Sequence, residues 1–151
     1  PIMAGAKIAG LLASARLEHI EAVGDFGLNL GMAFQIVDDI LDVVGDGARL
    51  GKPAGTDIRE GNVTLVAIHA LNDGSTIDAA ALSRLIRKRR KQEKEVQRAL
   101  GLLRDSNAVD KTRADAFAFG QIAQKSLDSV ADSPAKANMV RLVDFVLSRE
   151  V

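Results

Sequence analysis

A long apolar segment at residues 18–44 is the feature that most constrains how this chain can fold. Apolar side chains recur there at helical spacing on nearly every side. They include Val23, Phe26, Leu30, Phe34, Val37, Ile40, Leu41 and Val44. A helix that is apolar all round is normally buried. Three glycines within it, Gly24, Gly27 and Gly31, indicate close contact with a neighbouring helix.

Helical spacing of apolar residues continues along most of the chain, which predicts an all-α fold. Further helices are expected at residues 2–17, 63–72, 108–131 and 135–149, and from Ser75 or Thr76 to about Leu103. Residues 45–62 contain six glycine or proline residues and are interpreted as a loop. Ser133 before Pro134 is typical of a helix N-terminus.

Three of the expected helices have a predicted buried stripe. The stripes are Leu65, Ile68 and Leu71; Ala116, Phe119, Ile122, Ala123 and Leu127; and Met139, Leu142, Val143 and Val146. Residues 84–98 are interpreted as a solvated helix face, although such a basic run also attracts nucleic acid or an anionic membrane. Its cations are Arg84, Arg87, Lys88, Arg89, Arg90, Lys91, Lys94 and Arg98.

Composition removes several classes of function. The 151 residues predict one domain or part of one, and they include no cysteine and only two histidines, which disfavours thiolate and multi-histidine metal sites. Tyrosine and tryptophan are absent, which disfavours stacking on nucleic-acid bases. No apolar run approaches the roughly 18 residues that cross a bilayer, and no leader pattern opens the chain, so a cytoplasmic protein is expected.

Three carboxylates interrupt the apolar helix, at Asp38, Asp39 and Asp42. Asp38 and Asp42 lie one helical turn apart on one face, and no lysine or arginine occurs between Arg16 and Arg49 to neutralise them locally. Burying an unpaired carboxylate costs several kcal/mol. A Mg²⁺ ion would supply the positive charge, and it shares its ligand shell with substrate phosphates. The alternative is an exposed acidic turn, or one bridged by arginines from the second half.

A lysine among glycines follows the carboxylates. Lys52 lies within residues 50–61, where its ammonium can approach a polyanion without steric shielding. The glycine spacing does not match a Walker loop, and the aspartates do not match an EF-hand.

The combination of motifs closely resembles the trans-isoprenyl diphosphate synthases. The residues that carry it are Phe34-Gln35-x-x-Asp38-Asp39-x-x-Asp42, Gly51-Lys52-Pro53-x-Gly55-x-Asp57 and Gly61-x-x-Thr64-Leu65. The carboxylates resemble the second of that family's two aspartate-rich motifs. Ala6-Lys7-Ile8-Ala9 resembles its upstream Lys-Thr-Ala segment, and residues 142–149 are typical of longer-chain members.

The resemblance implies a helical-bundle enzyme that joins isopentenyl diphosphate to an allylic diphosphate with Mg²⁺. Residues 1–151 would be the C-terminal part of a single all-α polyprenyl synthase domain, working as a homodimer or with the missing N-terminal half. No nucleic acid and no transmembrane segment are expected.

The same resemblance assigns roles to particular residues. Asp38 would ligate Mg²⁺, and Asp39 and Asp42 would support the ion directly or through water. Lys7 and Lys52 would contact the allylic diphosphate. Gln35 would stabilise that side of the site, and Phe34 would line the cavity. Asp38, Asp39 and Lys52 make up the expected catalytic set.

Several positions depart from the family pattern. Ile8, Asn62 and Val66 replace a usual threonine, lysine and proline, and no second Asp-Asp pair occurs in the sequence. A non-catalytic or regulatory subunit of a heteromeric synthase is therefore an alternative. A class I terpene cyclase also ionises diphosphates, but its usual second metal motif is not evident.

Overall fold

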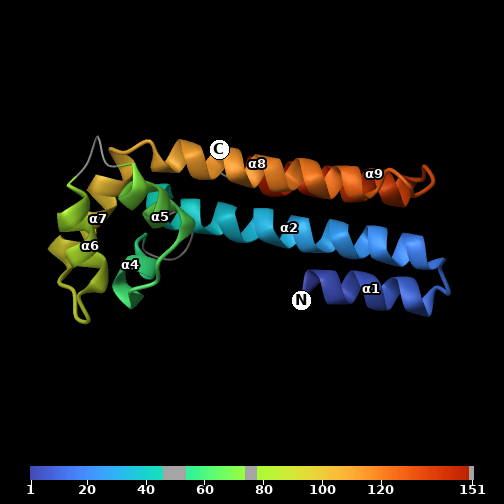
Figure 1. Cartoon of the computed structure of the whole chain (residues 1–151), viewed down its shortest axis with the longest axis horizontal. Coiled ribbons are helices and arrows are strands. Elements are labelled where there is room, and N and C mark those ends of the chain that lie inside the picture. Colours follow the sequence, from blue (N-terminus) through green and yellow to red (C-terminus); the bar gives the residue numbers. More distant parts are fainter. Residues whose placement is uncertain (46–53, 74–77, 150–151) are drawn as a thin grey trace. The chain divides into compact units, whose positions relative to one another are not determined.

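Helices account for all the regular structure in the described residues. The computed structural model describes residues 1–45, 54–73 and 78–149 (Figure 1). Its helices are α1 (Ile2–Leu12), α2 (Leu17–Val44), α4 (Thr56–Glu60), α5 (Leu65–Asn72), α6 (Ala79–Arg87), α7 (Glu93–Arg104), α8 (Ala108–Ser126) and α9 (Pro134–Ser148). The all-α prediction is confirmed. Over the same ranges, no helix has the length and apolar character that a membrane span requires.

The described residues divide into two compact units. One comprises residues 1–37 and 115–149, and the other comprises residues 38–114. Helix α2 enters the second unit at Asp38, and α8 leaves it at Asp115. The carboxylates of the sequence motif therefore begin where the second unit begins. A single polyprenyl synthase domain over residues 1–151 stays a prediction.

Small residues bring α1 against α2 in the first unit, where the two helices run side by side (Figure 1). A methyl group added at Gly27 would lie 3.0 Å from the Met3 Cα atom, and one added at Gly24 would lie 2.3 Å from Lys7 Cε. At Gly27 the near atoms are backbone, so a side chain there would require α1 to shift, whereas at Gly24 the near atoms belong to the flexible Lys7 side chain. The prediction of close helix contact is confirmed at Gly24 and Gly27, whereas at Gly31 the nearest atom, Ile2 Cδ1, lies at an ordinary contact distance of 3.7 Å.

Helices α8 and α9 pair through another glycine of the first unit. A methyl group at Gly120 would lie 2.8 Å from Leu147 Cδ1. The Ser133 hydroxyl accepts a hydrogen bond from the Lys136 amide, and Pro134 is the first residue of α9. The predicted helix start is confirmed, because the serine satisfies a free amide and proline has none to satisfy.

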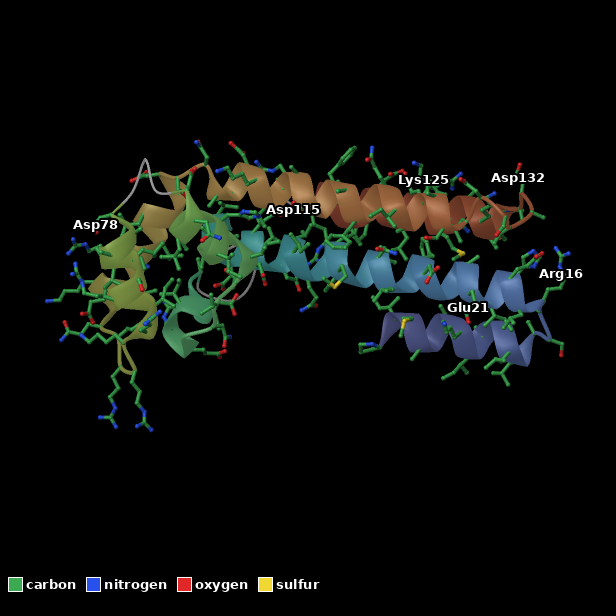
Figure 2. All side chains as sticks on the ribbon, in the orientation of Figure 1. Arg16, Glu21, Asp78, Asp115, Lys125 and Asp132 are labelled. Carbon is green, nitrogen blue, oxygen red and sulfur yellow. The ribbon has the colours of Figure 1, made fainter. Side chains whose placement is uncertain are left out.

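The second unit is built around α7, which contacts α4, α5 and α6. Its buried apolar residues include Ile40, Leu41, Val43, Ile58, Val66, Leu82, Ile86, Val96, Leu100 and Leu103. The first turns of α5 and α6 are capped by Thr64 and Asp78, which accept from the amides of Ala67 and Ala81. Figure 2 labels Asp78 at the start of α6.

The sequence was wrong about one helix and missed another. The helix expected up to Leu103 is two helices, because Lys88 is extended and the Glu95 carboxylate accepts from the Gln92 amide to start α7 afresh. Its expected caps, Ser75 and Thr76, lie outside the described residues. Helix α4 falls inside the segment interpreted as a loop. The first helix ends at Leu12, since Ser14 takes a φ of 51°.

The predicted buried stripes were partly wrong. In α5 the buried residues are Val66, Ala67 and Ala70, and Ile68 is 41% exposed. Ile122 and Leu142 are also exposed. In α5 the stripe assignment favoured the largest apolar residues, whereas the helix buries a valine and two alanines.

Two left-handed glycines offer a matched test of packing in the second unit. Gly55 and Gly61 both have a φ of 83°, but an added methyl would lie 2.8 Å from Val96 Cγ1 at Gly55 and no closer than 3.6 Å to any atom at Gly61. Gly61→Ala should lower the free energy of unfolding by about 1–2 kcal/mol through backbone strain alone. Gly55→Ala should cost about 1–3 kcal/mol more, because it overpacks the core. Urea unfolding of both variants measures the two losses in the free energy of unfolding. Equal losses would contradict the close packing of Val96 against Gly55.

Candidate functional site

The last two turns of α2 carry the three carboxylates, and their position is fixed from several sides. The Arg104 side chain donates a hydrogen bond of 2.7 Å to the Val43 carbonyl, which satisfies one of the free acceptors at the end of α2. Asp38 and Asp39 are half-buried, and Asp42 is only 3% exposed. The helix end is therefore an ordered part of the second unit.

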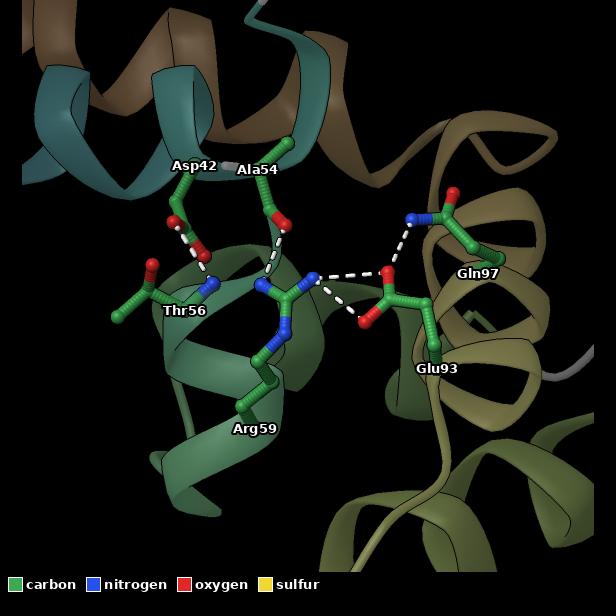
Figure 3. A network of polar contacts seen from close by, with 6 residues as sticks. All are labelled: Asp42, Ala54, Thr56, Arg59, Glu93 and Gln97. Atoms are coloured by element: carbon green, nitrogen blue, oxygen red, sulfur yellow. Dashed lines mark hydrogen bonds and ion pairs between the residues drawn. The ribbon is translucent and has the colours of Figure 1, made fainter. Parts of the chain in front are cut away.

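Asp42 supplies the N-terminal cap of α4 (Figure 3). Its two carboxylate oxygens accept hydrogen bonds of 3.0 Å from the amides of Thr56 and Asp57, and its carbonyl accepts one of 2.8 Å from Gly55. Gly55 itself has no side chain to cap the helix. Hydrogen bonds from amides to a charged carboxylate are stronger than neutral ones. The structure thus gives Asp42 a structural role that the sequence analysis did not anticipate.

Arg59 ties the same short helix to α7. Its guanidinium donates to the Ala54 carbonyl at 2.7 Å and to both oxygens of Glu93 at 2.8 and 3.0 Å (Figure 3). Gln97 donates to Glu93 as well. These hydrogen bonds lower the pKa of Glu93, with that from Gln97 having the largest effect. The sequence offered no sign of this pair, since 34 positions separate its members.

Asp39 lies opposite the start of α5. Its carboxylate accepts a long hydrogen bond of 3.4 Å from the Leu65 amide. Burial raises the pKa of Asp39, the Leu65 amide opposes that rise, and the charges of Asp57, Asp38 and Asp42 add to it. Asp57 is thus a fourth carboxylate of this neighbourhood, to which the sequence analysis gave no role although it lies within the quoted motif.

Neither Asp39 nor Asp42 forms an ion pair with any lysine or arginine of residues 1–45, 54–73 and 78–149. Within those ranges no three acidic, histidine or cysteine side chains are gathered closely enough to hold a metal ion by themselves. A cation here would need oxygen ligands beyond these side chains. Mg²⁺ matches that requirement, because it usually keeps several waters and takes phosphate oxygens into its shell.

Phe34 and Gln35 lie in the first unit and border an apolar pocket. The pocket has a volume of about 390 Å³ and lies between the first turn of α1, including Ile2 and Met3, and α2. The Arg149 guanidinium carbon lies 4.6 Å from the centre of the Phe34 ring, a cation–π distance that the sequence could not reveal. The pocket walls are mostly hydrocarbon, which suits an apolar ligand chain.

Lys7, an expected contact of the allylic diphosphate, lies beside Glu21 and Gly24 of α2. Its ammonium pairs with Glu21 at 2.6 Å, and its stem crosses α2 at Gly24; Figure 2 labels Glu21 on α2. At 1.5 Å per residue, the 14 positions from Glu21 to Gln35 span about 21 Å of helix. The structure does not bring Lys7 to Gln35. Lys52, the other expected diphosphate contact, lies outside the described residues.

Asn62 occupies the place of the lysine expected from the family pattern. Its amide donates to the carboxylates of Asp57 and Glu60, at 3.1 Å each. A lysine at this position would place a positive charge beside these carboxylates. Asn62 offers them only a neutral amide.

The family of the chain follows from the comparison with known proteins. The family model described as polyprenyl synthetase matches residues 2–103. The chain therefore belongs to the polyprenyl synthetase family, in agreement with the resemblance of its motifs.

Relatives and solved structures extend the match over almost the whole chain. The chain is 35% identical over 149 residues to a short chain isoprenyl diphosphate synthase of Methanothermobacter thermautotrophicus, covering 99% of this chain and 45% of that protein. A nonaprenyl diphosphate synthase of Mycobacterium tuberculosis is 33% identical over 148 residues, covering 98% and 44%. A polyprenyl synthase of Caulobacter crescentus, crystallised with calcium and isoprenyl diphosphate, superposes with a TM-score of 0.90 at 33% identity, covering 99% and 46%. The chain thus spans about half the length of these proteins.

The raised pKa of Asp39 makes a prediction about stability and pH. A carboxyl whose pKa is higher in the folded state stabilises the fold at low pH, and this contribution is lost as the pH rises through that value. Asp39→Asn should therefore be more stable than the parent at about pH 7, and the gain should shrink towards about pH 3.5. Urea unfolding between these pH values measures the difference in the free energy of unfolding, with Asp25→Asn on the exposed side of α2 as the control. A gain in stability that does not change with pH would contradict the raised pKa of Asp39.

Proposed function

We propose that this chain belongs to a prenyltransferase that condenses isopentenyl diphosphate with an allylic diphosphate in the presence of Mg²⁺. The observation that carries the proposal is the acidic end of α2, where Asp39 is half-buried with a raised pKa and no ion-pair partner among the described residues. The family supports the reaction class, and the bound isoprenyl diphosphate and calcium of the Caulobacter protein support the ligands.

The residues of the second unit have distinct proposed tasks. Asp38 and Asp39 would hold Mg²⁺ together with water and diphosphate oxygens. Asp42 would act mainly by holding α4 in place, since both its oxygens already accept amide hydrogen bonds. Lys52 would add a cation for the diphosphate. Bound Mg²⁺ would supply Lewis-acid stabilisation of the charge that develops on pyrophosphate as it leaves.

In the first unit, Phe34 and Gln35 would face the substrate from the rim of the apolar pocket. The reaction breaks the allylic carbon–oxygen bond, forms a carbon–carbon bond to isopentenyl diphosphate and releases pyrophosphate, which takes the departing proton. A hydrocarbon wall keeps water away from the reacting carbon. Lys7 would contact the allylic diphosphate by exchanging its partly exposed ion pair with Glu21 for the diphosphate.

The aspartate-rich motif in this sequence would be the second of two. We propose that residues 1–151 form the C-terminal part of the synthase domain, and that the first motif and the cations for isopentenyl diphosphate come from residues outside this sequence. The chain's coverage of about 45% of its relatives supports this division.

A non-catalytic subunit of a heteromeric synthase is the second candidate. The observation that favours it is Asn62, which replaces a cation and is engaged by Asp57 and Glu60. The two candidates differ in turnover. A catalytic chain elongates an allylic diphosphate in its own complete protein, whereas a regulatory subunit changes turnover only when a catalytic partner is added.

Metal-dependent binding of an allylic diphosphate tests the proposed site. Isothermal titration calorimetry with geranyl diphosphate should give measurable binding with Mg²⁺ and little with EDTA. Asp38→Ala should weaken binding by on the order of 10- to 100-fold, as expected when a group that supports a metal is lost.

The matched control is Asp25→Ala, which removes an exposed carboxylate from the same helix. It should bind geranyl diphosphate like the parent. Binding of equal strength without metal, or equal losses in both variants, would rule out the proposed metal site.

A further inference from the structure

The turn between α6 and α7 presents a cluster of cations in a fixed conformation. We call residues 87–91 the basic turn; its members are Arg87, Lys88, Arg89, Arg90 and Lys91. The Lys88 ammonium binds both oxygens of Glu95 at 2.6 and 2.8 Å, and the Lys91 ammonium donates to the Lys88 carbonyl at 2.8 Å. These contacts use two of the five cations to hold the turn.

The three arginines of the basic turn are exposed. None of them has an ion-pair partner in the part of the chain that the structure describes. The two nearest acids in sequence are already engaged, since Glu93 binds Arg59 and Glu95 binds Lys88. Side chains tipped with nitrogen project from this region (Figure 2). The local positive charge is therefore not compensated within the described residues.

Further cations continue the charge on either side. Arg84 lies one turn before Arg87 on α6, and Lys94 lies in the first turn of α7; both are exposed. Meanwhile the opposite faces of the two helices, with Leu82, Ile86 and others, are buried in the core of the second unit. The cations are thus held outward by the packing of the helices that carry them.

We propose that the basic turn docks the protein on the surface of a bilayer that contains anionic phospholipids. Clusters of four to eight lysines and arginines bind such surfaces, each contributing when it lies within about one Debye length of the headgroups. A bilayer presents many anions in one plane, so several exposed cations engage it together without a shaped pocket. The proposal rests on the charges of the second unit and does not depend on the proposed function.

Nucleic acid is the competing polyanion, and the composition of the second unit disfavours it. Residues 38–114 contain no phenylalanine, tyrosine or tryptophan on which a base could stack. Base stacking on aromatic side chains supplies much of the affinity for single strands. The interpretation of residues 84–98 as a solvated helix face holds for the exposure of the arginines but not for a continuous helix, because α6 ends at Arg87 and α7 begins at Glu93.

Co-sedimentation with vesicles tests the proposal. The purified protein should sediment with vesicles of phosphatidylcholine and phosphatidylglycerol, should sediment weakly with pure phosphatidylcholine, and should be released by salt. Arg89→Gln combined with Arg90→Gln should weaken binding by about 30-fold, the effect expected from removing two surface cations. The matched control is Lys125→Gln with Arg141→Gln, which removes two exposed cations of the first unit.

Three results would overturn the proposal. The first is equal sedimentation with neutral and anionic vesicles. The second is an equal loss in the control pair, which would indicate an effect of net charge alone. The third is displacement of the protein from the vesicles by a single-stranded RNA oligonucleotide, when sodium pyrophosphate at the same ionic strength does not displace it. That result would favour nucleic acid as the ligand of the basic turn.

Discussion

The carboxylate of Asp42 holds the end of α2 to the start of α4, and the geometry of the acidic site depends on it. Two amides of α4 donate to its side chain, and a third donates to its carbonyl. Arg104 fixes the adjoining Val43 carbonyl, and Arg59 anchors the far side of α4 on Glu93. Asp42 is buried and has no basic partner among the described residues, and the two backbone amides supply hydrogen bonds to both of its carboxylate oxygens.

Asp39 is in a less favourable electrostatic position than Asp42. The uncompensated negative charge around Asp39 is the physical basis of the proposed function. It receives one long hydrogen bond, is half-buried and is repelled by Asp57, Asp38 and Asp42. An arginine could have relieved the repulsion, but Arg59 is turned to Glu93 and Ala54. Keeping several carboxylates close together costs free energy that an ordinary structural site would avoid. In the proposed site, a divalent cation would remove that cost on binding, and diphosphate oxygens would complete its ligand shell.

The sequence predicted features that depend on neighbours in the chain better than features that depend on distant residues. The extent of α2 and the start of α9 followed from spacing and capping rules. The helix contacts at Gly24 and Gly27 were expected because glycine inside a helix usually has a packing reason. The break between α6 and α7 and the buried face of α5 depend on packing with distant residues, so periodicity alone misassigned them. In the site, the three aspartates could be found from charge in an apolar helix, whereas the Arg59–Glu93 pair, the cap formed by Asp42 and the Lys7–Glu21 pair required the fold. The assignment of Lys7 to the diphosphate rests on a motif and stays a prediction; in the structure its ammonium is paired with Glu21.

The most direct measurement of the central claim is an electron paramagnetic resonance titration with Mn²⁺ as a substitute for Mg²⁺, in the presence and absence of pyrophosphate. If the acidic end of α2 is incomplete as a metal site until phosphate oxygens join it, the signal of free Mn²⁺ should fall strongly only when protein and pyrophosphate are both present, and Asp38→Asn should abolish the effect of the protein. Retention of Mn²⁺ that is indifferent to pyrophosphate, or that survives in Asp38→Asn, would contradict the account.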